Sequence, residues 1–278
     1  MFVMYDINYL NEKSKVNIDI LDEIDSTNEE AKRRIKKGAQ EDFVLVARKQ
    51  TAGKGRKGRS FYSPKDTGIY LTYTHFTDDA AEDVLKVTVA TSVIAAGTIK
   101  DTLNIDCGIK WVNDLYLNGK KVSGTLCEYI FKGTFENEKN AVIVGIGINL
   151  STEDFPKEIS ETAGSLLPEN IINKSESQLK NIIDEKDSPL KTDYKNLIVL
   201  GITNGLYSFF KDCSLNEYLS LYKELSVVIG KEVELSDASG VLDSGRVIDF
   251  DDNGALILEN KNGEIKTYDS GEISLIML

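Results

Sequence analysis

The chain has 278 residues, 41% of them hydrophobic and 28% charged, a composition that predicts a globular protein with one substantial domain and a smaller one. Its formal net charge of −12 argues against broad nucleic-acid binding, because such binding depends on a basic surface that releases phosphate counterions. The single histidine, His75, argues against a histidine-rich zinc site and against a Ser-His-Asp triad.

Features of the whole chain also bear on its compartment. Residues 1–10 lack a basic segment followed by a long apolar stretch, so we expect no secretory signal. The longest apolar run, around 141–150, is too short to span a bilayer. The cysteines are odd in number and lack metal-ligand spacing, which predicts reduced thiols at Cys107, Cys127 and Cys213. We therefore expect a soluble, cytoplasmic protein that does not bind membranes.

The first third of the chain predicts three strands and one helix. Residues 25–39 predict the helix, with Ser26 as its N-cap, Glu29 completing a Ser-x-x-Glu capping box, and Gly38 at its C-terminal end. Apolar and alternating patterns predict the strands at 16–24, 42–49 and 68–75.

The middle of the chain predicts a long helix, a hairpin and a buried strand. Residues 80–102 are largely apolar and predict a helix that is too hydrophobic for a surface position. Residues 109–129 predict a hairpin, because Asn-Gly at 118–119 is the strongest short hairpin signal. A buried strand is predicted at 141–150, and the polar, charged residues 168–195 predict a mobile surface insertion.

The C-terminal part predicts two helices, at 197–212 and 214–225, followed by a small barrel. From residue 227 onward, short strands alternate with Asn-Gly and Asp-Ser-Gly turns. Helices and strands intermix without a regular β-α-β-α rhythm, which favours an α+β fold with a mixed or antiparallel sheet and helices on one face. We predict a main domain over residues 1–226 and a β-barrel domain over residues 227–278.

Residues 50–60 place three glycines among four basic residues in an otherwise acidic chain. The glycines match G-x-G-x-x-G, and residues 53–60 nearly match the P-loop pattern, but both motifs require a helix directly after the glycines. Pro64 and Gly68 prevent a regular helix there, so neither motif applies. The segment remains either a flexible, positive loop that approaches a small anionic ligand or an ordinary solvated loop.

The predicted hairpin separates a polar face from an apolar one. A two-residue turn pairs Leu117 with Lys120, Tyr116 with Lys121, and Asp114 with Ser123. Alternation then puts Lys110, Asp114, Tyr116, Lys121 and Ser123 on one face and Trp111, Leu115, Leu117, Val122 and Leu126 on the other. Asp114 and Lys121 become diagonal neighbours, which either form an ordinary cross-strand ion pair or meet around a ligand.

Two further stretches allow a ligand site or a structural explanation. Gly145, Gly147 and Asn149 share one strand face, where missing side chains make room for a ligand or for close packing by a helix. Ser26 and Thr27 can cap the helix that they precede, or they can bind a polar ligand with their hydroxyls and the free backbone N–H groups.

Together, "DSTNEEA", "QTAGKGRKGRSFYSP", "KWVNDLYLNGKKVSGTLCE", "VGIGINL" and "SGEISL" resemble, in order and spacing, the motifs of biotin–protein ligases, or biotin–[acetyl-CoA-carboxylase] ligases. The resemblance covers roughly residues 18–278. It implies a catalytic domain related to class II aminoacyl-tRNA synthetases, followed by an SH3-like β-barrel. The activity it implies converts biotin and MgATP to biotinyl-5′-AMP and then transfers biotin to the ε-amine of a lysine on the biotin carrier domain of a carboxylase.

The same resemblance assigns roles to individual residues. The ligand contacts that it implies are Ser26, Thr27, Asn28 and Gln50 at the biotin ureido ring, Lys54, Gly55 and Arg56 in a loop closing over biotin and the adenylate, Lys121 at the carboxylate and phosphate oxygens, and Asn149 at the adenine. The candidate catalytic residues are Lys121, Arg56 and Asp114, with Asp114 orienting groups near the reacting centre. Mg²⁺ is expected to accompany ATP, and no residue of the chain is predicted as a metal ligand.

The chain also departs from the family pattern. Bifunctional members carry a DNA-binding domain before the catalytic region, whereas 25 residues precede Ser26 here, so we expect a monofunctional enzyme that does not bind DNA. Ile276 and Phe61 stand where the family often has Arg and Trp, which bears on the ATP contacts. An exposed edge strand would allow a homodimer. The alternatives are a lipoate ligase or octanoyltransferase with the same core fold, and a non-catalytic regulator that senses biotin.

Overall fold

The structure of the protein is a computed structural model. It describes residues 5–78, 84–135, 137–167, 194–212, 215–237, 239–270 and 272–275. Nearly all of the insertion predicted at 168–195 lies outside the described residues, as do Cys213 and Ile276.

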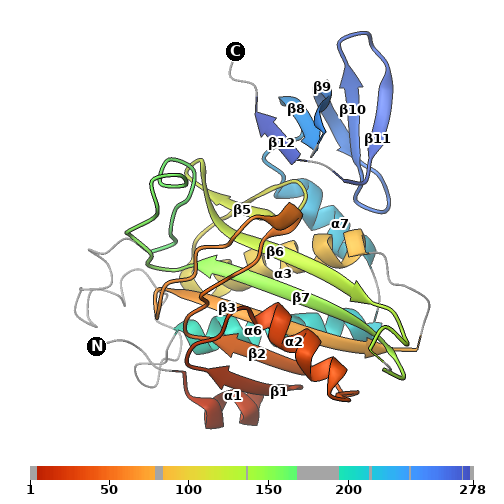
Figure 1. Ribbon diagram of the computed structural model, residues 1–278. Coiled ribbons are helices and arrows are strands. Elements are labelled where there is room, and N and C mark those ends of the chain that lie inside the picture. The colour runs from red at the N-terminus through yellow and green to blue at the C-terminus, as the bar shows by residue number, and fades with distance from the viewer. Residues whose placement is uncertain are drawn as a thin grey trace.

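A seven-stranded mixed sheet forms the centre of the larger part, as Figure 1 shows. Its strand order is β1-β2-β3-β7-β6-β5-β4. Only β1 and β2 pair in parallel among these neighbours; the other pairs are antiparallel. The predicted mixed sheet is therefore confirmed. The strands are Asn17–Leu21 (β1), Phe43–Ala47 (β2), Gly68–Thr77 (β3), Gly108–Lys110 (β4), Asp114–Leu117 (β5), Lys120–Ile130 (β6) and Asn140–Asn149 (β7).

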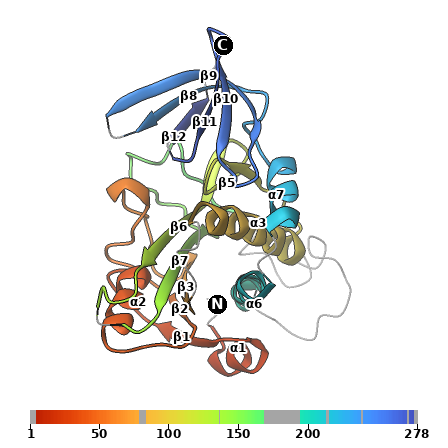
Figure 2. The same ribbon diagram turned by 90° about the vertical axis from the view of Figure 1, so that its right-hand side faces the viewer.

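Helices cover this sheet unequally. The long helices α3 (Val84–Leu103) and α6 (Tyr194–Asp212) lie on one face, and the shorter α2 (Thr27–Lys36) lies on the other (Figure 2). The helices α1 (Ile7–Lys13) and α7 (Leu215–Glu224) complete the larger part. Because the sheet is covered on both faces, its inner strands are apolar on both sides: β2 is buried at all five positions. The predicted placement on one face holds for the two long helices, and α2 occupies the opposite face.

The N-terminus of α2 differs from the prediction. Ser26 occupies the N-cap position, but its side chain makes no capping hydrogen bond, so the predicted capping box is not formed. Gln50, which is distant in sequence, accepts a hydrogen bond from the Thr27 amide instead, at 2.8 Å. The C-terminal end agrees with the prediction: Gly38 has a φ of 96°, and the next amide closes the turn onto Arg34 O.

The hairpin of β5 and β6 turns at the predicted Asn-Gly pair, where Asn118 and Gly119 have φ values of 51° and 77°. Its register shifts between Leu115 and Tyr116, so that Asp114 pairs with Gly124 rather than with Ser123. The prediction of an unbroken ladder was therefore wrong. At this point β6 has one residue more than β5, which forms a β-bulge.

The bulge changes which side chains share a face. Ser123 pairs with Leu115 and lies on the core side of the sheet, where it is buried. Leu126 pairs with Gly145 and lies on the opposite face. Both residues are thus on the face opposite to the predicted one, because an extra residue in a strand inverts the alternation beyond it.

A second, antiparallel sheet follows α7, with strand order β11-β10-β9-β8-β12. The predicted domain boundary after residue 226 falls between α7 and this sheet, and it stays a prediction.

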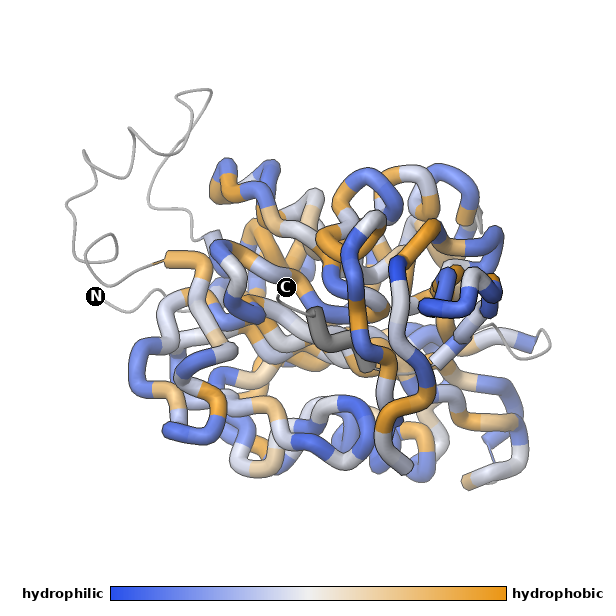
Figure 3. The backbone as a smooth tube through the Cα atoms, turned by 90° about the horizontal axis from the view of Figure 1, so that it is seen from above, coloured by the Kyte–Doolittle hydropathy of each residue, from blue (hydrophilic) through white to orange (hydrophobic). Residues whose placement is uncertain are grey.

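Figure 3 shows hydrophilic residues at many of the turns around the edge of the molecule. The strands are Glu232–Asp237 (β8), Gly240–Phe250 (β9), Leu256–Asn260 (β10), Ile265–Tyr268 (β11) and Glu272–Leu275 (β12).

Buried contacts join the second sheet and its turns to the larger part. The Trp111 indole N–H, from the segment between β4 and β5, donates to Gly254 O at 3.0 Å, and Trp111 is 3% exposed. Tyr222 of α7 packs edge-on against Phe250 of β9, with 5.1 Å between ring centroids. The second sheet is therefore anchored beside the hairpin.

The outer strands of the large sheet have local partners. Ile109 of β4 exchanges backbone hydrogen bonds with Leu225 and Val227, in the segment after α7. Ile18 of β1 exchanges two hydrogen bonds with the Asn11 side chain, at 2.8 and 3.0 Å. These contacts occupy the backbone groups of Ile109 and Ile18, so these two positions do not offer a free edge for a second chain. The homodimer predicted through an edge strand stays a prediction.

Two properties of the described residues complete this picture. Cys107 and Cys127 are free, and burial raises the pKa of both thiols to about 12, as expected for reduced structural cysteines. Within the described parts of the chain, no helix combines the length and the apolar character needed to cross a membrane.

Candidate active site

A cavity of about 390 Å³ lies on the face of the large sheet that also carries α2. Its walls come from the start of α2, the glycine-rich loop 50–60, the β5–β6 hairpin, β7 and the segment 155–163. Every predicted site residue lines it: Ser26, Thr27, Asn28, Gln50, Lys54, Gly55, Arg56, Asp114, Lys121 and Asn149. The fold thus brings these residues together, while their individual roles stay predictions.

Two glycines of β7 make room for side chains of the cavity. A Cβ atom at Gly145 would overlap the amide group of Asn28, and one at Gly147 would overlap the ring of Phe61. The strand face predicted to be open is therefore partly filled by these two side chains. Phe61 also packs edge-on against Tyr70, with ring centroids 6.5 Å apart.

A continuous chain of polar groups surrounds the start of α2. Gln50 Oε1 accepts from the backbone N–H and the hydroxyl of Thr27, at 2.8 and 3.0 Å. Thr72 Oγ1 lies 2.7 Å from both Thr27 Oγ1 and Asn28 Oδ1. Thr27 and Asn28 are each 3% exposed, so these hydrogen bonds fix buried side chains.

The glycine-rich loop is folded as a small hairpin of its own. The Gly55 amide donates to Arg59 O and the Phe61 amide donates to Gly53 O, both at 2.8 Å. Lys57 and Gly58 adopt positive φ values of 54° and 75°. The segment contains one turn of 3₁₀ helix and no α-helix, as expected from the argument against a P-loop.

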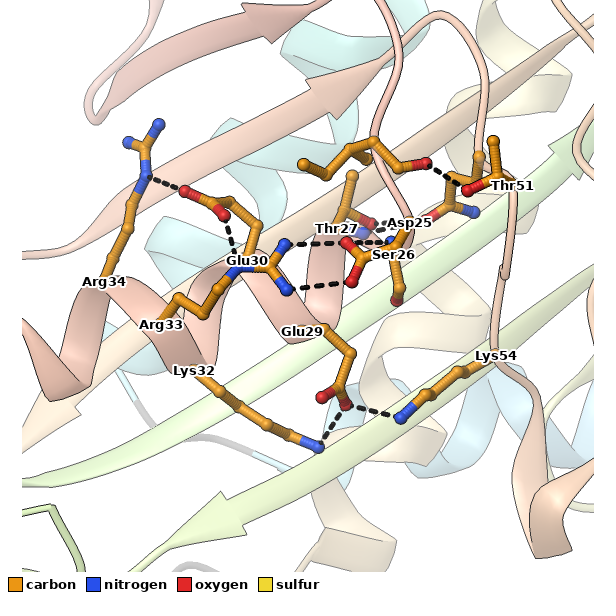
Figure 4. Close-up of polar contacts among 12 residues, drawn as sticks. Asp25, Ser26, Thr27, Glu29, Glu30, Lys32, Arg33, Arg34, Thr51 and Lys54 are labelled. Carbon is orange, nitrogen blue, oxygen red and sulfur yellow. Dashed lines mark hydrogen bonds and ion pairs between the residues drawn. The ribbon is translucent and has the colours of Figure 1, made fainter.

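Two contacts hold this loop against the rest of the cavity. Lys54 pairs with Glu29 at 2.7 Å, and Lys32 pairs with the same carboxylate at 2.9 Å, as Figure 4 shows. Hydrogen bonds from Lys54 and then from Lys32 lower the pKa of Glu29. Arg56 donates to Asn113 Oδ1 at 3.3 Å. Asn113 in turn donates to a backbone carbonyl of β6 at 2.7 Å, which orients its amide.

The predicted pair on the hairpin forms inside the cavity. Asp114 Oδ1 lies 2.6 Å from Lys121 Nζ and forms an ion pair with it. Asp114 is the one carboxylate among the described lining residues. The basic residues of the lining are Lys54, Arg56, Arg59, Lys110 and Lys121. This concentration of cations in an acidic protein suits a ligand that carries carboxylate and phosphate groups.

Asn149 presents an unused acceptor at the end of β7. Its Nδ2 donates to Gly164 O at 3.0 Å, which directs Oδ1 the other way. That oxygen is buried and has no hydrogen-bond partner among the described residues. A buried acceptor without a donor is costly, so the position favours a ligand that brings an N–H group.

Several residues at the site were not predicted. Glu128 and Thr72 contact Asn28, and Asn113 contacts Arg56. Gly124 lies on the cavity face, and strand alternation from Gly124 places Glu128 on the same face. The β-bulge puts Gly124 on that face, and the sequence gives no sign of the bulge. Within the described residues, no group of three or more His, Cys, Asp or Glu side chains is placed to hold a metal ion.

Comparison with known proteins agrees with this geometry. Residues 20–149 match the Biotin/lipoate A/B protein ligase family, and residues 228–276 match the Biotin protein ligase C terminal domain. Residues 20–149 therefore form a domain of this ligase family, and residues 228–276 form the C-terminal domain of biotin protein ligases. The two matched regions hold the cavity-forming sheet and the second sheet, and the family expected from the motifs is confirmed.

Individual ligases resemble the chain over different lengths. The "Bifunctional ligase/repressor BirA" of Bacillus subtilis is 29% identical over 258 residues, which cover 91% of this chain and 72% of that protein. The "Biotin--[acetyl-CoA-carboxylase] ligase" of Paracoccus denitrificans is 36% identical over 135 residues, covering 46% and 52%. A solved biotin protein ligase from Aquifex aeolicus, in complex with biotin and ATP, has a TM-score of 0.68 at 27% identity and covers 94% of this chain and 98% of its own.

Proposed function

We propose that the protein is a biotin–protein ligase that activates biotin with MgATP and transfers it to a lysine on the biotin carrier domain of a carboxylase, of which acetyl-CoA carboxylase is the candidate. The observation that carries this proposal is the division of the cavity. Neutral amide and hydroxyl groups surround the start of α2, and cations gather at the loop and hairpin. Biotin has the matching polarity, with a neutral ureido ring at one end and a carboxylate at the other.

The ureido ring is assigned to Ser26, Thr27, Asn28 and Gln50. A cyclic urea offers two N–H donors and one carbonyl acceptor, and hydroxyl and amide side chains supply both kinds of partner. The side chains of Thr27 and Asn28 are already held by Gln50 and Thr72, so little conformational entropy is lost when a ligand binds. Competing ligands without a ureido group would leave these buried groups unpaired.

In the first step, a carboxylate oxygen of biotin attacks the α-phosphorus of ATP. A new O–P bond forms as the bond from phosphorus to the bridging oxygen of pyrophosphate breaks. Lys121 and Arg56 are assigned to stabilise the charge on the carboxylate and the phosphoryl oxygens, because fixed cations are the main aid to phosphoryl transfer. Mg²⁺ bound to the nucleotide would supply positive charge at the pyrophosphate, and Asp114, the one carboxylate among the described lining residues, would be available to hold it.

The adenine is assigned to Asn149, whose unpaired Oδ1 suits the exocyclic amine of the base. Phe61 offers an aromatic ring in the same part of the cavity, over Gly147. A phenyl ring has less area for stacking than the indole that the family often has at this position, so we expect a smaller contact with the base.

In the second step, the ε-amine of the carrier lysine attacks the acyl carbon of biotinyl-5′-AMP. The bond to the phosphate oxygen breaks, AMP leaves, and the amine loses a proton as the amide forms. Asp114 is the candidate acceptor for that proton. The catalytic domain is assigned to residues 1–226, and the SH3-like domain to residues 227–278.

The decisive experiment is a transfer assay with biotin, MgATP and a biotin carrier domain, read by mass spectrometry. A carrier in which the target lysine is replaced by arginine is the matched control. Modification of the wild-type carrier alone supports the proposal, and an unmodified carrier counts against it. Replacing biotin by lipoate or octanoyl donors in the same assay tests the lipoate ligase and octanoyltransferase alternatives. Tight biotin binding without pyrophosphate release would indicate the non-catalytic regulator.

A further inference from the structure

Glu128 lies on β6, outside the lining of the cavity, and contacts a side chain that lines it. Its Oε2 accepts from Asn28 Nδ2 at 2.9 Å, and its Oε1 accepts from Lys32 Nζ at 2.7 Å. The Glu128 side chain is 27% exposed, and that of Lys32 is 22% exposed. The carboxylate therefore connects a cation on the outer side of α2 to an amide inside the cavity.

This contact is the shorter of two that orient the Asn28 amide, because Nδ2 also donates to Leu126 O at 3.4 Å. A carboxylate can only accept hydrogen bonds, so the group that faces Glu128 must be the NH₂ of Asn28. The amide oxygen is then directed at Thr72 Oγ1, 2.7 Å away, and lies over Gly145, where the missing Cβ leaves it room. An oxygen accepts two hydrogen bonds, so Oδ1 keeps one lone pair for a ligand.

The ion pair with Lys32 stabilises this arrangement. Burial lowers the pKa of Lys32, but hydrogen bonds to Glu128 and Glu29 outweigh it and raise the pKa overall. Lys32 is therefore cationic and forms an ion pair with the Glu128 carboxylate at 2.7 Å. An ionised carboxylate has no proton to donate, so it offers Asn28 a single choice of orientation.

We propose that Glu128 is a positioning residue for biotin: by fixing the Asn28 amide, it presents an acceptor to a ureido N–H of the ligand. This inference rests on the proposed function. In the reverse orientation, the Asn28 NH₂ would face the ureido N–H, and two donors would oppose each other. The hydrogen bond from Asn28 to Glu128 thus disfavours this reverse orientation before biotin binds.

The variant Glu128→Gln tests this idea because it keeps the shape of the side chain and adds a donor. A glutamine amide can turn its own NH₂ toward Asn28, so that only the longer bond to Leu126 O, at 3.4 Å, opposes the reverse orientation of Asn28. The matched control is Glu30→Gln. Glu30 lies on α2, pairs with Arg33 at 2.7 Å and has a side chain 19% exposed, and the contacts described for it are to arginines.

Binding of biotin alone, measured by titration calorimetry, is the first readout. We expect Glu128→Gln to raise the biotin Kd by about tenfold, the effect of losing one well-oriented hydrogen bond to a buried group. The Kd for ATP and the midpoint of thermal unfolding should stay close to those of Glu30→Gln. At saturating biotin, the rate of pyrophosphate release should approach that of the wild type, so that KM for biotin rises while kcat is retained.

The outcomes separate this inference from the proposed function. If the wild-type protein does not bind biotin, the proposed function fails. If it binds biotin and Glu128→Gln binds equally well, the positioning role is refuted while the function stands. A loss of ATP affinity and of thermal stability as large as the loss of biotin affinity would show that Glu128 is merely structural, and would also overturn the inference.

Discussion

Replacing Lys121 with alanine removes the cation that lies 2.6 Å from Asp114 in the cavity. The two side chains are 33% and 22% exposed, so water can enter the space that the lysine leaves beside Asp114 Oδ1, although that oxygen is buried in the wild type. A partly exposed ion pair contributes about 0–1 kcal/mol to stability, and we therefore expect the free energy of unfolding to change by no more than about 1 kcal/mol.

The effect on adenylation should be much larger. If Lys121 stabilises charge on the carboxylate and phosphoryl oxygens only as the reaction proceeds, its loss should cost about 3–4 kcal/mol, or a rate lower by about 100- to 1,000-fold. The assay is biotin-dependent release of pyrophosphate at saturating biotin and MgATP. Chemical denaturation of the same samples measures whether the fold is retained.

The neighbouring Lys120 supplies the control, because alternation places it on the other face of β6. Its Nζ donates to Ser160 O at 3.2 Å, in an exposed contact. Lys120→Ala should release pyrophosphate at close to the wild-type rate. A near-normal rate for Lys121→Ala would refute its catalytic role, and a large loss of stability would refute the argument from exposure.

Four further outcomes follow from named contacts. Glu29→Gln should increase tryptic cleavage in the glycine-rich loop, because Lys54 loses the partner that lies 2.7 Å away; unchanged cleavage would show that this contact does not hold the loop. The same contact predicts a pH dependence: since the pKa of Glu29 is lowered from its usual 4.5, the stability it contributes is complete above that value and is lost as the pH falls through the lower, folded-state pKa. An NMR titration of the Lys54 side chain should therefore change below pH 4.5, and a transition centred above that pH would contradict the assignment. Arg56→Gly should speed the release of biotinyl-5′-AMP into solution, whereas leakage equal to that of the parent would exclude a closing role. Trp111→Phe leaves the buried carbonyl of Gly254 without its donor, so the free energy of unfolding should fall by about 1–3 kcal/mol in guanidinium denaturation, and no change would mean that the carbonyl finds another partner.

Much of the local structure follows from the sequence, because its causes are local. Asn118 and Gly119 tolerate the positive φ values that a two-residue turn requires, so the hairpin could be located before any contact was known. Gly38 likewise ends α2 where a positive φ is needed. Pro64 and Gly68 were enough to exclude a helix after the glycine-rich loop.

The sequence also brought the candidate site residues together as one set, through motifs that recur in order and spacing. The structure adds that all of them line one cavity. Their roles, and the boundary between the two domains, stay predictions that the experiments above address.

Other features depend on contacts between residues far apart in the chain. The helix α2 is capped at Thr27 by Gln50 rather than by the adjacent Ser26, because the fold carries a better-placed acceptor to the amide. The bulge opposite Asp114 inverts the strand alternation, and with it the faces of Ser123 and Leu126. No local pattern encodes either outcome.

The turns, the helix ends and the chemical types gathered for the site therefore follow from the amino-acid sequence, since these depend on the backbone preferences and functional groups of near neighbours. The orientation of the buried groups depends on the packing of the folded chain. Glu128 and Asn28 are 100 positions apart, and only the packing of α2 across β6 and β7 makes the carboxylate of one fix the amide of the other. Hydrogen bonds between buried side chains are set by geometry within a few tenths of an ångström, which sequence periodicity does not specify.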